Sequence, residues 1–308
     1  MANPPLLRSE VSEFSSRQPA FALTIHQRRW FSYFVRYLIA AVLIVFAFTP
    51  VVWVISASIN PAGSLMSIEI IPRNPSLENY TGMFQNNYYP FTTWLWNSFK
   101  ISSISTILIV LSTALAAYAL SRFRFAGRQH LMHGILLVNI FPRTLSIIAL
   151  YAVIQQLGNR VPILGLDSHA SLILIYLSGA LSINVFLMKG YLDSIPMEID
   201  ESALVDGAAH WQIFRYITLP LATPIIVTIG VLTFMAIYGD FILPRVVLQS
   251  SEQLTIMVGL YFFQSADYAQ NWGIFTAGAV VAALPLLIAY LLLQRYIISG
   301  LTAGAVKL

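Results

Sequence analysis

The chain has 308 residues, of which 57% are hydrophobic and only 10% are charged. Soluble proteins carry about 25% charged residues, so this composition excludes a soluble enzyme, a disordered tail protein and a fibre. We attribute the net charge of +4 to basic residues in cytoplasmic loops rather than to nucleic-acid binding. The absence of cysteine excludes disulfides, thiolate metal sites and cysteine nucleophiles. We therefore predict an all-α polytopic membrane protein.

The first 30 residues are polar, and the apolar run that follows is longer than the 7–15 residues of a signal-peptide core. We predict a cytoplasmic N-terminal tail over 1–34 and an uncleaved first helix. Six stretches reach the ~20 apolar residues that a bilayer requires. They are 37–58, 101–121, 131–154, 170–188, 221–243 and 272–293. They define a transmembrane domain over 35–295, and a cytoplasmic tail over 296–308 follows.

The basic residues predict the orientation of these spans. With the N-terminus placed in the cytoplasm, 12 of the 17 fall on the cytoplasmic side and four on the other, and Arg143 lies within the third span. Lys and Arg concentrate in cytoplasmic loops, so we expect both termini to be cytoplasmic. The pair Trp94 and Trp96 is interpreted as an aromatic anchor at the membrane interface before the second span.

Signatures of catalysis are missing from the sequence. It contains no phosphate-binding glycine loop, no HExxH, no GxSxG and no pair of carboxylates within a span, and no two of its five histidines have i, i+4 spacing. We predict neither an enzyme nor a metal site. Four polar residues in or near spans are candidates for lining a pathway: Asn139, Arg143, Asn184 and Asp240.

These four candidates have alternative explanations. Hydrogen bonds between helices explain Asn139 and Asn184 as well as ligand contact does, and a position at the interface explains Asp240. Arg143 either faces a water-filled cavity, or the helix breaks at Pro142 and the guanidinium reaches outward to water.

Five of the 13 acidic residues lie in the predicted cytoplasmic loop 191–220. Ser194 and Pro196 form a helix-start signal, and acids behind them favour the positive end of the helix dipole. Gly207 breaks this helix or lets another backbone approach closely. An apolar stripe suits a second short helix: Trp211, Phe214 and Ile217. A helix–turn–helix is predicted here; the alternative is a loop that merely connects two spans.

The same loop carries a recognisable pattern. Glu201-Ser202-Ala203 is followed after three residues by Gly207, after nine more by Ile217, and after one more by Leu219-Pro220. This pattern resembles the EAA loop of bacterial ABC-importer permeases, with Ser202 in place of the usual alanine. Segments 95–98, 117–127, 141–142 and 300–307 also resemble carbohydrate permeases, and 150–152, 161–166 and 189–191 are similar to MalG-type permeases of maltose/maltodextrin importers. The resemblance covers roughly 35–308, with departures at Arg143, at Leu308 and in the longer N-terminal tail.

The resemblance implies a type I ABC-importer permease fold in the bacterial inner membrane, with six transmembrane helices and cytoplasmic EAA coupling helices. It implies a MalF-like second permease, a dimeric MalK-like ATPase and an extracytoplasmic maltose-binding protein, with maltose or maltodextrin as the substrate and loop 244–271 probing the binding protein. The ATPase would bind ATP and Mg, and this chain would bind no cofactor. The residues expected at the ATPase contact are Glu201, Ser202, Ala203, Asp206, Gly207, Ile217, Leu219 and Pro220.

Other functions are weighed against this one. Within the same class, the sugar is alternatively trehalose or another glucoside. A stand-alone secondary carrier should show paired internal repeats of broken helices, and the sequence has no second copy of the EAA segment. A membrane-embedded transferase would need acid–base groups that the spans and loops do not offer.

Overall fold

The computed structural model describes residues 25–61, 72–86, 89–138, 143–264 and 271–303. Within these ranges the regular structure is helical and contains no strand, so the predicted all-α class is confirmed. The chain divides into two compact units, Met1–Trp53 and Val54–Leu308.

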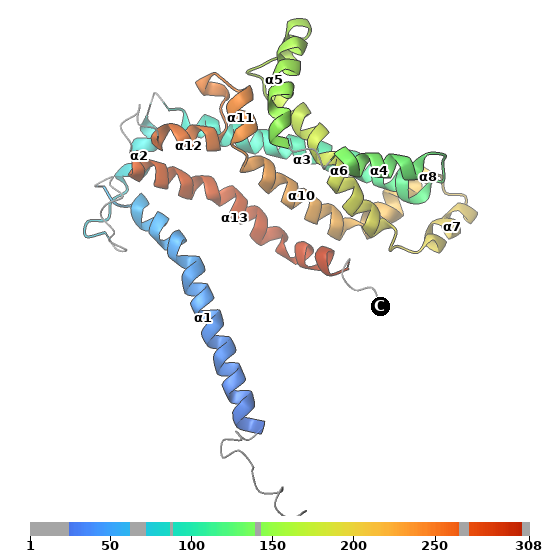
Figure 1. Ribbon diagram of the computed structural model, residues 1–308, viewed down its shortest axis with the longest axis horizontal. Coiled ribbons are helices and arrows are strands. Elements are labelled where there is room, and N and C mark those ends of the chain that lie inside the picture. The colour runs from blue at the N-terminus through green and yellow to red at the C-terminus, as the bar shows by residue number, and fades with distance from the viewer. Residues whose placement is uncertain (1–24, 62–71, 87–88, 139–142, 265–270, 304–308) are drawn as a thin grey trace, which may run out of the picture. The chain divides into compact units, whose positions relative to one another are not determined.

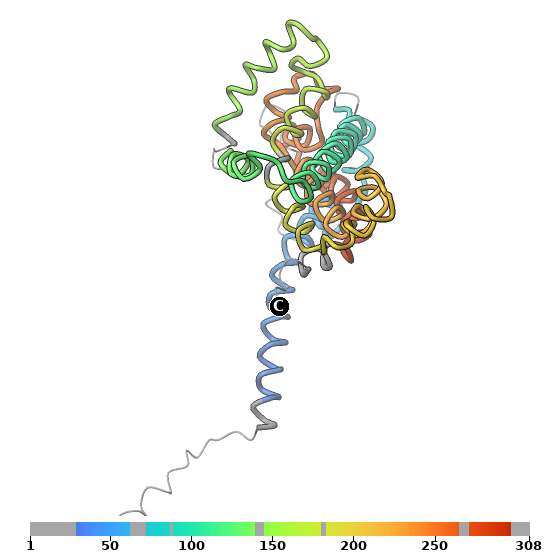
Figure 2. The backbone as a smooth tube through the Cα atoms, turned by 90° about the vertical axis from the view of Figure 1, so that its right-hand side faces the viewer, coloured from blue at the N-terminus to red at the C-terminus, as the bar shows by residue number. Residues whose placement is uncertain are grey.

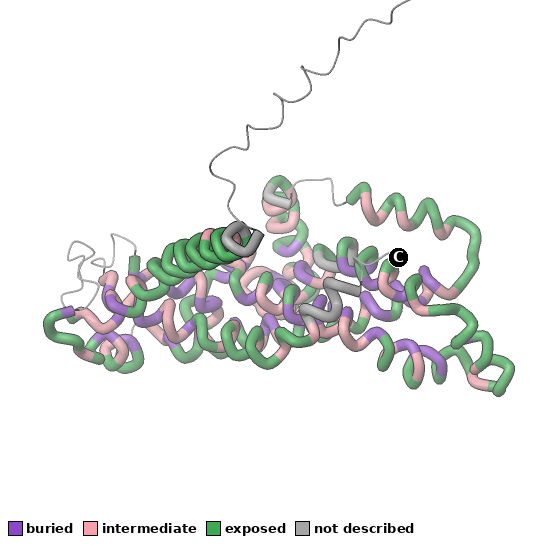
Figure 3. The backbone as a smooth tube through the Cα atoms, turned by 90° about the horizontal axis from the view of Figure 1, so that it is seen from below, coloured by how far each residue is buried: buried purple, intermediate pink, exposed green. Residues whose placement is uncertain are grey.

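The first unit contains most of helix α1 (Ile25–Ser58). The residues of α1 are exposed along most of its length, as the colouring of the backbone in Figure 3 shows. Among its apolar side chains, Tyr37 is 74% exposed and Phe46 is 78% exposed. The stretch Arg29–Ser58 has the length and hydropathy of a membrane span and includes the predicted span 37–58. A helix that is apolar all round is typical of a segment that lies in lipid.

The second unit is built on four long helices: α3 (Phe91–Arg122), α6 (His169–Leu192), α10 (Thr223–Tyr238) and α13 (Trp272–Ala303). Helix α3 packs against α6 and α10, and α10 packs against α13 (Figure 1). Along α3, Ser102, Ser105, Thr113 and Ala117 are fully buried. Residues this small let helix backbones approach closely, which is how helices pack in membranes.

Shorter elements complete the second unit. Near the start of α3 lie α2 (Glu78–Gln85), α11 (Ile242–Val247), η3 (Ser251–Gln253) and α12 (Ile256–Gln264). Near its end lie α7 (Met197–Val205), α8 (His210–Ile213), the π-helical segment η2 (Phe214–Thr218) and α9 (Leu219–Leu221). Helix α4 (Arg128–Val138) follows α3, and η1 (Pro162–Leu164) follows α5 (Arg143–Arg160). Helix α5 projects from the body of the unit in both Figures 1 and 2.

The buried apolar side chains form two clusters, one toward each end of α3. The larger cluster includes Phe91 and Trp94 of α3 with Leu260 and Phe263 of α12. The smaller cluster joins Ala117 and Tyr118 of α3 to Met188 of α6, Phe214 of η2 and Ile229 of α10. Both ends of α3 are therefore anchored in packed cores.

The six predicted spans do not map one to one onto helices. Three described helices are long and apolar enough to span a membrane: Arg29–Ser58, Phe91–Arg122 and Trp272–Tyr296. Two bent pairs raise this to five: His169–Gly179 with Ile183–Leu192, at 51°, and His210–Leu221 with Thr223–Tyr238, at 74°. The predicted span 131–154 is divided between α4 and α5, and residues 139–142 lie outside the described ranges.

Candidate functional site

The segment between α6 and α10 has the predicted helix–turn–helix form. Helix α7 begins after Pro196, and its first turn carries Glu198 and Asp200. The helix predicted from Ser194 and Pro196 therefore begins where expected, although the Ser194 hydroxyl donates backward to the Tyr191 carbonyl oxygen at 2.6 Å and does not cap α7. Proline fixes φ, so Pro196 rather than a serine cap sets the direction of entry.

Gly207 ends α7 in a left-handed conformation, with φ of +84°. Its amide donates to Leu204 O at 3.0 Å, and the Ala208 amide donates to Ala203 O at 2.9 Å. This pair of hydrogen bonds is the Schellman motif, which satisfies the last carbonyls of a helix and favours glycine. Among the described residues, no atom lies within 4 Å of the position of a Gly207 Cβ. The positive φ, rather than close approach within this chain, therefore requires glycine.

The second arm of the loop is a helical stretch from His210 to Leu221 that contains the π-helical η2. Its buried residues are Ile213, Phe214 and Thr218, whereas Trp211 is 59% exposed. The predicted second helix is therefore present, and the rings of Trp211 and Phe214 pack together along it, with centroids 5.5 Å apart. A π turn adds a residue to one helical turn and so rotates the following side chains, which a regular i, i+3 pattern does not anticipate.

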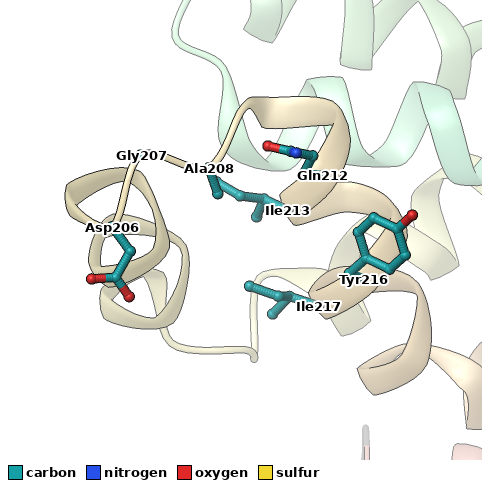
Figure 4. A pocket seen from close by; sticks show the side chains of 7 residues that line it. All are labelled: Asp206, Gly207, Ala208, Gln212, Ile213, Tyr216 and Ile217. Atoms are coloured by element: carbon teal, nitrogen blue, oxygen red, sulfur yellow. The ribbon is translucent and has the colours of Figure 1, made fainter.

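An open pocket of about 360 Å³ lies between the two arms (Figure 4). Ile213 and Ile217 point from the second arm toward the turn, which contributes Asp206, Gly207 and Ala208. Three of the predicted contact residues therefore meet at one pocket: Asp206, Gly207 and Ile217. Glu201 and Ser202 lie on exposed parts of α7 with Ala203 half-buried, and Leu219 and Pro220 lie in α9 at the end of the second arm.

Two of the four polar pathway candidates, Asn184 and Asp240, have side chains within the described part of the structure. Asn184 is buried, and its Nδ2 donates to Thr233 Oγ1 at 3.3 Å, so it joins α6 to α10. Asp240 accepts a hydrogen bond from the Tyr176 hydroxyl at 2.8 Å. Helix-to-helix bonding, one of the two explanations given for Asn184, is therefore observed for that residue, whereas Asp240, which lies between α10 and α11, is bonded to α6. Asn139 and the side chain of Arg143 lie outside the described part of the chain.

At the other end of α3, the segment 248–256 is held by hydrogen bonds. Trp94 Nε1 donates to Ser251 O at 2.7 Å, Asn97 Nδ2 donates to Glu252 O at 2.8 Å, and Ser98 Oγ accepts from the Ile256 amide at 2.7 Å. Trp94 is fully buried, so its interpretation as an interface anchor is wrong, whereas Trp96 is 60% exposed. Trp94 is buried because it packs against and bonds to the segment around Ser251, which lies far along the chain.

Asp167 holds the same segment from the loop before α6. Its carboxylate accepts from the amides of Gln249 and Ser250 at 2.8 and 2.9 Å and from the Ser250 hydroxyl. Desolvation raises the pKa of Asp167, but these hydrogen bonds outweigh it and hold the pKa below its ordinary value. Its φ of +61° is left-handed, which Asp and Asn tolerate better than most residues.

Replacing Asp167 with Ala is expected to speed amide exchange at Gln249 and Ser250 about tenfold, because hydrogen bonds to a charged acceptor are lost and Ala disfavours the positive φ. The exchange rate in Asp167→Asn should lie between those of wild type and Asp167→Ala, since Asn tolerates the backbone conformation and keeps one acceptor oxygen. In the wild type, a lowered folded-state pKa means that this stabilisation is full above about pH 4 and is lost as the pH falls through the folded value. Hydrogen exchange measured by mass spectrometry tests this, and equal exchange in Asp167→Ala and wild type would contradict it.

Comparison with known proteins identifies the class. Residues 122–302 match the family model described as "Binding-protein-dependent transport system inner membrane component". The chain is 38% identical over 271 residues to the maltose/maltodextrin transport system permease protein MalG of Vibrio vulnificus (strain YJ016), covering 84% of this chain and 90% of that protein. It is 37% identical over 281 residues to the galactooligosaccharides transport system permease protein GanQ of Bacillus subtilis (strain 168), covering 91% of this chain and 97% of the relative.

The fold has solved counterparts. A chain from the crystal structure of a bacterial ABC transporter involved in the import of the acidic polysaccharide alginate superposes with a TM-score of 0.71. The match covers 89% of this chain and 98% of that chain, at 22% sequence identity. At that identity the likeness concerns the fold alone.

Proposed function

Because the chain belongs to the family of binding-protein-dependent transport system inner membrane components, we propose that it forms half of the translocation pathway of an ABC importer for maltose and maltodextrins. The identity to a MalG permease over nine-tenths of that relative's length carries this proposal. The chain supplies the pathway and no catalysis. A MalF-like second permease completes the pathway, a dimeric MalK-like ATPase binds ATP and Mg and drives transport, and an extracytoplasmic binding protein delivers the sugar.

The loop from α7 to α9 docks on the ATPase in this proposal. Its support is the match to the EAA pattern together with the geometry: two helical arms joined at Gly207, with an open pocket between them. Exposed carboxylates on α7 and at its end suit a basic partner surface: Glu198, Glu201 and Asp206. The residues assigned to the contact are Glu201, Ser202, Ala203, Asp206, Gly207, Ile217, Leu219 and Pro220. Asn139, Arg143, Asn184 and Asp240 stay predicted pathway residues.

The proposed topology has six spans over 35–295 with both tails, 1–34 and 296–308, in the cytoplasm, which follows from the distribution of basic residues. The native chain has no cysteine, so single cysteines report cleanly on exposure. Cysteines introduced at Ser16 and Thr302 should react with an impermeant maleimide only after cells are permeabilised. Reaction in intact cells without an outer barrier would place that terminus outside and overturn the topology.

The experiment that tests the function is uptake by vesicles containing this chain with its partner permease, ATPase and binding protein. Labelled maltotriose should enter only with ATP, the ATPase and the binding protein present, and vesicles with this chain alone should neither hydrolyse ATP nor take up sugar. Saturable uptake by the chain alone would refute the permease role. A second substrate class, the galacto-oligosaccharides, is favoured by the identity to GanQ. Binding of each labelled sugar by the cognate binding protein decides between the two classes.

A further inference from the structure

One buried side chain connects helix α7 to the rest of the second unit. All of α7 lies within the described part of the chain, and Asp200 is its one buried residue, at 7% exposure. The neighbouring positions Ile199, Glu201 and Ser202 are exposed. A carboxylate is the residue type least expected to be buried without a partner, because removing its charge from water is costly.

The partner of Asp200 is the last residue of α3. Arg122 Nε lies 2.6 Å from Asp200 Oδ2, and the two side chains are only 6% and 10% exposed. The same guanidinium donates through Nη2 to the Ile195 carbonyl oxygen at 3.2 Å. Arg122 therefore contacts the segment that enters α7 as well as α7 itself, and the planar guanidinium fixes both in one orientation.

The end of α3 makes further contacts with both sides of the loop. The Ser121 hydroxyl donates to Asp193 Oδ1 at 2.7 Å, at the end of α6. Tyr118 packs against Phe214 of the second arm, with ring centroids 5.0 Å apart, and its hydroxyl donates to the His210 carbonyl oxygen at 3.4 Å. The second arm is therefore held by a core cluster, whereas the one buried residue of α7 is joined to α3 by the ion pair.

We propose that Arg122 and Asp200 are positioning residues, whose ion pair holds α7 on the end of α3 so that α7 follows the motion of that helix. The proposal rests on the docking role assigned to α7 above. Helix α3 runs without a break from Phe91 to Arg122, and its first turns hold the segment 251–256 through Trp94, Asn97 and Ser98. One helix thus contacts both the segment after α11 and α7, at opposite ends of the unit (Figure 1).

Breaking the pair from one side leaves an unpaired charge in a buried place, which is more damaging than removing both charges together. We therefore use Arg122→Gln, Asp200→Asn and the double variant. The controls neutralise one basic and one acidic residue at exposed positions outside the loop, Arg124→Gln and Glu78→Gln. All variants are tested in the full complex with its partner permease, ATPase and binding protein.

The direct measurement is hydrogen exchange of the α7 amides. Either single variant should speed exchange across 198–205 about tenfold and leave the middle of α3 unchanged, because the buried anchor of α7 is lost. The double variant should exchange no faster than the single variants, which is the non-additivity expected of a contacting pair. The controls should match wild type. Unchanged exchange in both single variants would overturn the proposal.

The functional measurement is the number of ATP molecules hydrolysed per sugar transported. Unfolding of part of the sample lowers hydrolysis and transport together, so it leaves this ratio unchanged. The single variants should raise this number about threefold or more, because a loosened α7 transmits the ATPase motion poorly to α3. A wild-type ratio in variants whose α7 exchanges faster would overturn the coupling role. Failure of the wild-type complex to transport any sugar would instead refute the proposed function, while the exchange result would still decide whether the pair positions α7.

Discussion

Replacing Gly207 with Asp is expected to reduce recovery of the ATPase with this chain, and sugar uptake with it, about tenfold or more. Gly207 has φ of +84° and lies beside the pocket between the two arms of the loop. An aspartate tolerates the left-handed backbone better than most residues, but it places an unpaired charge where the ATPase is proposed to pack. The space beside Gly207 is open within this chain, so the penalty arises mainly on docking.

Gly207→Asn is the matched control for this prediction. Asn tolerates the same left-handed conformation and has the same size as Asp, but it brings no charge. It should therefore keep most of the uptake, and Glu201→Ala should also be mild, because an exposed ion pair is worth ~0–1 kcal/mol. Membrane insertion should survive all three changes. Full uptake and full ATPase co-purification with Gly207→Asp would mean that this loop does not dock the ATPase.

The local parts of the loop were predictable because their signals are local. A proline before a run of acids, a glycine two residues past the end of α7 and apolar residues beyond it all act within one or two helical turns. The π turn at Phe214–Thr218 was not predictable, since the residues there fit a regular helix equally well by propensity. The pocket depends on how the two arms fold against each other, and so it was missed as well.

The start of α3 and the contacts at its two ends were not predicted, for a different physical reason. Asn97, Ser98 and Lys100 lower the hydropathy of its first turns, so a hydropathy window begins the span at 101 although the helix begins at Phe91. Asn97 and Ser98 are bonded to the segment 252–256, about 155 residues away in the chain. Arg122 was counted as a cytoplasmic loop charge. Its burial against Asp200 comes from a contact between residues far apart in the chain, which no local pattern of residues indicates.

Replacing Gly259 with Ala is expected to destabilise the assembled complex, lowering its melting temperature by about 5–10 °C. Gly259 lies in α12, and a Cβ there would be 2.0 Å from Cε3 of Trp94. The indole has no room to yield, because it is fully buried, its Nε1 donates to Ser251 O, and Phe263 packs beside it with ring centroids 6.0 Å apart. Helix α12 must therefore shift away from α3, which opens the larger core cluster.

Two variants separate this overlap from a general effect of placing alanine in a helix. Gly190→Ala, in α6, places its Cβ where no described atom lies within 4 Å, so it should leave the melting temperature unchanged or raise it slightly. Trp94→Leu removes the ring that the added methyl group would strike, and adding Gly259→Ala to it should cost much less than Gly259→Ala costs in the wild type. Melting is followed by the fraction of complex that stays assembled after heating. If Gly259→Ala destabilises as much in the Trp94→Leu background as alone, close packing of α12 on Trp94 is not the reason for glycine at this position.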